Sequence, residues 1–269
     1  MKSISMASSQ KGATLIVVMF MLILLTLVGV YAIKTAMTSL NIATNVQIGQ
    51  FLSQTADTPI NQFSTLDLSK VTDLSGVIGY ALKDSEFEAG NEYIFCYRPT
   101  DKAKFGSVLK VATLRPPETA TGKATVAAGG KTAFCDLTKD FGSSREAVVT
   151  QVAVKIPIDS TSDLAPGSLL PEGTNASNGT IFKGVSDQKR IRITTTSILP
   201  AFAKDISAAQ DCVGVDASKP GYISDNTDSD YKNFKTIATC LTDLGVPVNS
   251  QMQEFSLQTL IRLIEKPQG

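Results

Sequence analysis

The chain has 269 residues, enough for one large domain or two small ones. Its 25 lysines and arginines balance 25 aspartates and glutamates, so it lacks the basic excess of a general nucleic-acid or anionic-membrane binder. It contains no histidine, the commonest general base and metal ligand, which lowers the expectation of a hydrolase or a zinc site.

A long uncharged segment begins close to the N-terminus. Residues 13–33 are 21 residues without a charge, bounded by Lys11-Gly12 and Lys34. As a helix they would cross about 30 Å, the thickness of one hydrocarbon core. The apolar core of a signal peptide is shorter, about 7–15 residues. The length therefore favours a retained anchor, and cleavage of a conventional signal peptide after Val30-Tyr31-Ala32 stays as an alternative.

Helical spacing of apolar residues continues through residues 35–56, which are polar but also uncharged. We expect one helix over residues 13–56. It should end at Asp57-Thr58-Pro59, because the residue before a proline avoids the α-helical region. A solvated helix normally carries charges on its open face, so the lack of charge indicates a helix that is covered on more than one side.

These residues resemble the start of type IV pilin precursors, and more narrowly of PilX-like minor pilins. The basis is Lys11-Gly12 placed directly before the apolar run. The resemblance implies that residues 1–12 are a leader removed by prepilin peptidase and that the new N-terminus, Ala13, is methylated. It also implies that residues 13–33 hold the protein in the inner membrane, with the head in the periplasm, before the protein joins an extracellular fibre.

One position departs from the family pattern. Most pilins carry glutamate at the fifth mature position, where this chain has Val17. In the family this carboxylate is thought to neutralise the N-terminal amine of a neighbouring subunit, and a carboxylate persists in hydrocarbon only where it has a partner. The resemblance therefore implies that a subunit with Val17 sits at the pilus tip. The alternative is that Val17 simply continues a membrane anchor.

Residues 57–203 have the composition of a soluble, β-rich head. A helix is expected around residues 72–82, with Thr72 or Asp73 as its N-cap. Alternating and β-branched stretches predict strands over residues 92–98, 107–114, 147–158 and 189–199. The pilin architecture implied by the resemblance would pack these strands, as an antiparallel sheet, on the second half of the long helix.

Residues 204–269 predict a disulfide-stapled helical region. One helix is expected before Gly245 and Pro247, which are C-terminal stop signals. Ser250 and Gln253 have capping-box spacing and predict another helix, although a strand could begin there instead. The expected fold is thus α+β, with a long transmembrane or fibre helix, an antiparallel pilin-like head and a helical C-terminal subdomain.

Four widely spaced cysteines without a C-x-x-C motif fit two disulfides better than a metal site, and they imply an oxidising compartment. They are Cys96, Cys135, Cys212 and Cys240. Of the three connectivities that are open, we favour Cys96–Cys135 with Cys212–Cys240. The second loop is either a partner-binding surface, as in the disulfide-bounded region of many pilins, or only a staple.

Two charged clusters are weak binding candidates. Asp225, Asp228 and Asp230 resemble calcium-loop acids but lack the sixth-position glycine and terminal glutamate of an EF-hand, so a solvated, helix-capping turn is favoured. Arg190 and Arg192 share one strand face without an aromatic platform for bases, so we expect a solvated face and no nucleic-acid contact other than an indirect one.

No catalytic motif is present, and we expect a non-enzymatic protein without a cofactor. The resemblance implies a minor pilin that primes assembly and sits at the tip, serving adhesion, motility or DNA uptake. Its partners would be other minor pilins, the major pilin, the inner-membrane assembly platform and a large tip adhesin. The alternatives are a type II secretion tip pseudopilin, which also lacks the glutamate, and a secreted or anchored periplasmic binding module with a conventional signal sequence.

Overall fold

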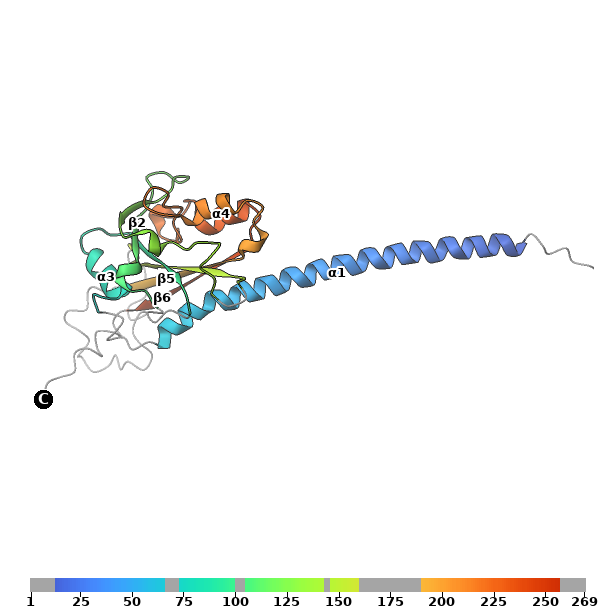
Figure 1. Ribbon diagram of the computed structural model, residues 1–269, viewed down its shortest axis with the longest axis horizontal. Helices are drawn as coiled ribbons and strands as arrows, with labels where there is room; N and C mark the ends of the chain where they lie inside the picture. Colours follow the sequence, from blue (N-terminus) through green and yellow to red (C-terminus); the bar gives the residue numbers. More distant parts are fainter. Residues whose placement is uncertain (1–12, 66–72, 100–104, 143–145, 160–189, 257–269) are drawn as a thin grey trace, which may run out of the picture. The chain divides into compact units, whose positions relative to one another are not determined.

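The computed structural model describes residues 13–65, 73–99, 105–142, 146–159 and 190–256 (Figure 1). The chain forms two compact units, residues 1–48 and 49–269. Helix α1 (Ala13–Thr65) contributes its first part to one unit and its last part to the other. The expected leader, residues 1–12 with Lys11 and Gly12, lies outside the described residues.

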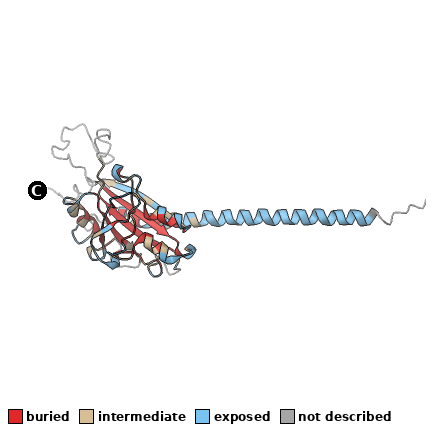
Figure 2. Cartoon of the chain, turned by 90° about the horizontal axis from the view of Figure 1, so that it is seen from above, coloured by how far each residue is buried: buried red, intermediate tan, exposed pale blue. Residues whose placement is uncertain are grey.

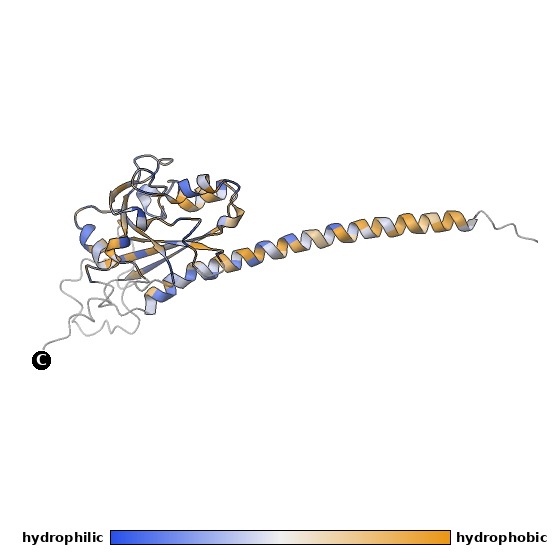
Figure 3. Ribbon diagram, in the orientation of Figure 1, coloured by the Kyte–Doolittle hydropathy of each residue, from blue (hydrophilic) through white to orange (hydrophobic). Residues whose placement is uncertain are grey.

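The first unit is helical from Ala13 onward, and its side chains from residue 14 to residue 47 are exposed. Figure 3 shows that the most apolar part of α1 is its N-terminal portion. Helix α1 is long and apolar enough to cross a membrane. A signal sequence or the core helix of a soluble protein can have the same length and composition. The expected long apolar helix is therefore present, and it starts at Ala13.

The expected helix end at Asp57 is wrong, because α1 continues through Pro59 to Thr65. Proline has no N–H and removes one hydrogen bond from the helix. Contacts with the sheet compensate for this loss. The Thr195 hydroxyl donates to the carbonyl oxygen of Ala56 at 2.8 Å, and Phe63 is buried against the Phe255 ring with 4.5 Å between their centroids.

The second unit is built on a six-stranded antiparallel sheet in the order β3-β2-β1-β4-β5-β6. The strands are β1 (Glu92–Tyr97), β2 (Ala112–Arg115), β3 (Thr125–Ala128), β4 (Val149–Lys155), β5 (Arg190–Ile198) and β6 (Val248–Ser256). Three of them, β1, β4 and β5, fall within the predicted stretches. The stretch predicted over residues 107–114 is a strand only from Ala112, because Val108–Lys110 form a 3-10 turn, and β2 extends to Arg115. The sequence patterns did not predict strand β3.

The sheet separates two buried layers. Tyr93 and Phe95 of β1 face a core that contains Ile60 and Phe63 of α1 and the helix α3 (Val77–Asp84). Residues of opposite parity face the helices α4 (Ile206–Val213) and α5 (Ile237–Asp243), because successive side chains of a strand point to opposite faces. Figure 2 shows buried strands in the second unit, and the buried ones are β1, β4 and β5, whereas the edge strands β3 and β6 are more exposed. The N-cap of α3 is Gly76, not the expected Thr72 or Asp73.

The end of the described chain is a strand, so the helix expected from Ser250 is wrong. Strand β6 pairs with β5 from Arg190↔Ser256 to Ile198↔Val248. Alternate β6 side chains point to opposite faces of the sheet. Gln251 donates to the Ser53 hydroxyl on the α1 face, and Glu254 accepts from Arg192 on the opposite face. Pairing along the whole of β5 overrides the local capping-box spacing. Helices α4 and α5 are thus a helical excursion between two strands of one sheet.

Candidate functional site

The exposed part of α1 is a candidate binding surface, because it is the longest run of exposed apolar side chains among the described residues. Its big apolar side chains are 49% exposed at Leu24 and 75% exposed at Tyr31, with the others in between over residues 15–33. Soluble monomers rarely expose contiguous apolar patches larger than a few hundred Å². This helix therefore needs lipid or protein around it.

Threonine hydroxyls of this helix are satisfied from within. The hydroxyls of Thr26, Thr35, Thr38 and Thr44 donate to backbone carbonyl oxygens three or four residues earlier, at 2.8–3.0 Å. Such back-bonding leaves these hydroxyl donors in no need of an outside partner. Residues 13–33 can therefore enter apolar surroundings at low cost, because the backbone and the Thr26 hydroxyl keep their hydrogen bonds. Beyond them the helix carries Lys34 and the amides of Asn41 and Asn45, which favour polar surroundings.

Of the expected processing residues, the structure describes only Ala13, which is the first residue of α1. Val17 follows one helical turn later, and its side chain is 60% exposed. No acidic residue stands between Ala13 and Ala56, so the first acid of this helix is Asp57, far from its N-terminal end. The tip placement inferred from Val17 stays a prediction.

Both disulfides are present in the pairing that we favoured. Cys96 and Cys135 join β1 to the segment after β3, with 4.9 Å between their Cα atoms. Cys212 and Cys240 join α4 to α5, with 5.8 Å between their Cα atoms. All four cysteines belong to one hydrophobic cluster under the sheet. The two disulfides therefore stabilise the same layer from two sides.

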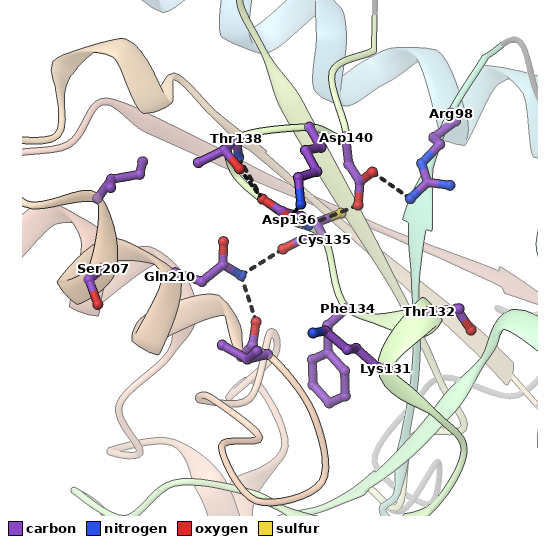
Figure 4. Close-up of a pocket in the computed structure, with 14 residues that line it drawn as sticks. Arg98, Lys131, Thr132, Phe134, Cys135, Asp136, Thr138, Asp140, Ser207 and Gln210 are labelled. Carbon is purple, nitrogen blue, oxygen red and sulfur yellow. Dashed lines mark hydrogen bonds and ion pairs between the residues drawn. The ribbon is translucent and has the colours of Figure 1, made fainter.

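A groove of about 510 Å³ lies beside the first disulfide, between residues 131–140 and helix α4 (Figure 4). Gln210 binds the two sides together: its Oε1 accepts from the Leu137 N–H at 2.8 Å, and its Nε2 donates to the Cys135 carbonyl at 2.7 Å. Arg98 pairs with Asp140 at 2.5 Å. These polar groups hold the groove walls together, which accounts for their positions without a ligand.

Two of the predicted calcium-loop acids lie in a buried ionic cluster on the sheet face opposite α1. Nη1 of Arg192 lies 2.7 Å from an Asp225 carboxylate oxygen and 2.6 Å from one of Asp228. Lys155 Nζ lies 2.7 Å from the other oxygen of Asp228. Nη2 of Arg192 also donates to Glu254 at 2.6 Å. We call these five residues the ionic cluster.

The ionic cluster corrects two expectations. Arg192 is not on a solvated sheet face, since it is 3% exposed, and the turn with Asp225 and Asp228 is buried too. Asp230 is exposed and takes no part, and α5 is capped by Thr236, not by an aspartate. Within the described ranges, no group of three or more cysteine or acidic side chains is placed to hold a metal ion. The cluster instead ties the loop between α4 and α5 to the sheet.

Glu92 of β1 lies next to the ionic cluster and is fully buried. Its two carboxylate oxygens accept from the backbone N–H groups of Ser224 and Asp225 at 2.7 and 2.9 Å. Burial nevertheless raises the pKa of Glu92 to about 7, although Lys155 and these hydrogen bonds oppose the rise. Burial acts on Asp225 in the same direction, but the Thr227 and Arg192 hydrogen bonds prevail and lower its pKa. Sequence reasoning missed Glu92 and Lys155, because nothing local marks them.

Comparison with protein-family models, with curated proteins and with solved structures finds no match to this chain.

Proposed function

We propose that the chain is a minor pilin of a type IV pilus, with a non-enzymatic role in priming assembly and a place at the fibre tip. The observation that carries the proposal is helix α1. Its exposed part has no charge except Lys34, and its continuation, residues 49–65, packs on an antiparallel sheet. One helix thereby offers an apolar surface for a fibre or a membrane and also forms part of the folded head.

Three further features support the proposal. Lys11-Gly12 precede the apolar run, as in prepilins. The two disulfides suit the periplasm and the cell exterior. The helix between Ala13 and Ile33 is long enough to hold the protein in the inner membrane before assembly. Other minor pilins, the major pilin, the assembly platform and a large tip adhesin would be its partners.

The first test is the mass of the N-terminal peptide of the mature protein isolated from membranes. A methylated peptide that starts at Ala13 is expected, and it should be replaced by an uncleaved leader in cells without prepilin peptidase. A peptide that starts at Ile33 would mean that a conventional signal peptide had been removed, and the proposal would then be wrong. Presence of the protein in sheared pili, compared with secretion pseudopili, separates the pilus from the type II secretion machine.

The tip position has its own test. Gold-labelled antibody against the head should mark one end of wild-type fibres. Val17→Glu restores the family's carboxylate and is expected to spread the label along the shaft without loss of assembly. Label distributed evenly along wild-type fibres would refute the tip placement, and it would leave the pilin assignment standing.

A further inference from the structure

Lys34 is the only charged residue in residues 13–56 of α1. It is exposed, and none of the residues three or four positions away is acidic, so the usual helical ion pairs are not open to it. The nearby hydroxyls of Thr35 and Thr38 are neutral groups, and their protons are used within the helix, where they donate to the Tyr31 and Lys34 carbonyls at 3.0 Å. The helix therefore offers its ammonium no carboxylate within reach, and a charged acceptor has to come from outside the helix.

The acceptor must change when the surroundings of the helix change. In a membrane, Lys34 directly follows a 21-residue apolar span, so its flexible side chain would lie among lipid phosphates at the interface. In a fibre the helix is surrounded by other helices and no phosphate is at hand. An ammonium without a partner is disfavoured there, and a carboxylate is its natural complement.

We propose that Lys34 is an ion-pairing site for a carboxylate on the helix of a neighbouring fibre subunit, and that this neighbour is a different protein. The first part rests on the proposed pilin function. The second follows from composition, since residues 13–56 of this chain contain no aspartate and no glutamate. A second copy packed in register alongside α1 would bring another lysine to this position, and the first acid of its helix, Asp57, lies 23 residues further along, about 35 Å at 1.5 Å per residue. Lys34 thus selects a heterotypic neighbour and fixes the register of the two helices.

The test compares the amount of protein in sheared fibres with the amount in membranes for three variants. Lys34→Met should lower incorporation about tenfold or more, because it leaves the neighbour's carboxylate unpaired. Lys34→Arg keeps the charge and should stay within about twofold of wild type. Thr35→Val is the matched control and should change nothing, because its hydroxyl serves only its own helix. Lys34→Met incorporated as well as wild type would overturn the proposal.

A carbodiimide, which joins an amine to a nearby carboxylate as an amide, tests the contact directly. Treated fibres should yield the Lys34 peptide joined to an acidic peptide of a different subunit, and treated membranes should not. The exposed pair Lys235–Asp243, at 2.7 Å, reports within the same sample that the reaction worked. If that internal product forms and Lys34 stays free in fibres, the proposal is wrong. Wild-type protein absent from every fibre would refute the pilin function itself, before any variant is examined.

Discussion

Arg192→Met should strongly destabilise the second unit. Arg192 donates to Asp225, Asp228 and Glu254 at 2.6–2.8 Å, and its side chain is 4% exposed. Methionine fills a similar volume but leaves two aspartates buried beside Lys155 as their remaining cation. Removal of one partner from a buried ion pair costs about 3–5 kcal/mol, so we expect a loss of unfolding free energy in that range.

Urea unfolding of the detergent-solubilised chain, followed by tyrosine fluorescence, measures this loss. Arg115→Met is the control, because Arg115 pairs with Glu88 on the exposed surface and its removal should leave the urea midpoint nearly unchanged. Asp228→Asn added to Arg192→Met should recover part of the loss, since it removes one of the orphaned charges. An Arg192→Met midpoint equal to wild type would refute the view that the ionic cluster holds the 224–228 loop to the sheet.

Three other predictions are also tested by urea unfolding, and the third is tested by amide exchange as well. Because the pKa of Glu92 is raised from 4.5 to about 7, its stabilising contribution is complete below pH 4.5 and is lost as the pH rises through 7. Wild-type stability should therefore fall by about 3 kcal/mol across that window relative to Glu92→Gln, and parallel pH profiles would contradict this. Serine at both Cys212 and Cys240, which are 28 residues apart, should cost about 3–4 kcal/mol, and an unchanged midpoint would show that the loop needs no staple. Thr195→Val removes the donor to the Ala56 carbonyl and should cost about 1–3 kcal/mol, with faster amide exchange in residues 60–65; unchanged exchange would mean that α1 passes Pro59 unaided.

The sequence predicted those parts of the fold that have a local signature. The uncharged run after Gly12 predicted α1, and alternation predicted most of β1, β4 and β5. The failures share a cause, which is that contacts distant in sequence decided the outcome. Pro59 ends a helix in isolation, but here a Thr195 hydroxyl and buried contacts carry α1 past it. Likewise the residue spacing from Ser250 fits a helix start, but the segment forms strand β6 because it pairs with β5 along its whole length.

The candidate sites also differ in whether local sequence or contacts distant in sequence determine them. The isolation of Lys34 can be predicted from the sequence, because it depends only on the absence of other charges nearby on the same helix. The burial of Asp225 and Asp228 could not be predicted from the sequence, because acidic residues in a turn are usually solvated. Only the fold places Arg192 and Lys155 next to them. The buried charges of the ionic cluster are thus neutralised within the chain, while Lys34 on the exposed part of α1 is the charge that we propose is paired by a partner. That asymmetry agrees with the proposed assembly subunit, in which the ionic cluster is satisfied inside the head and the helix is to be covered by neighbours.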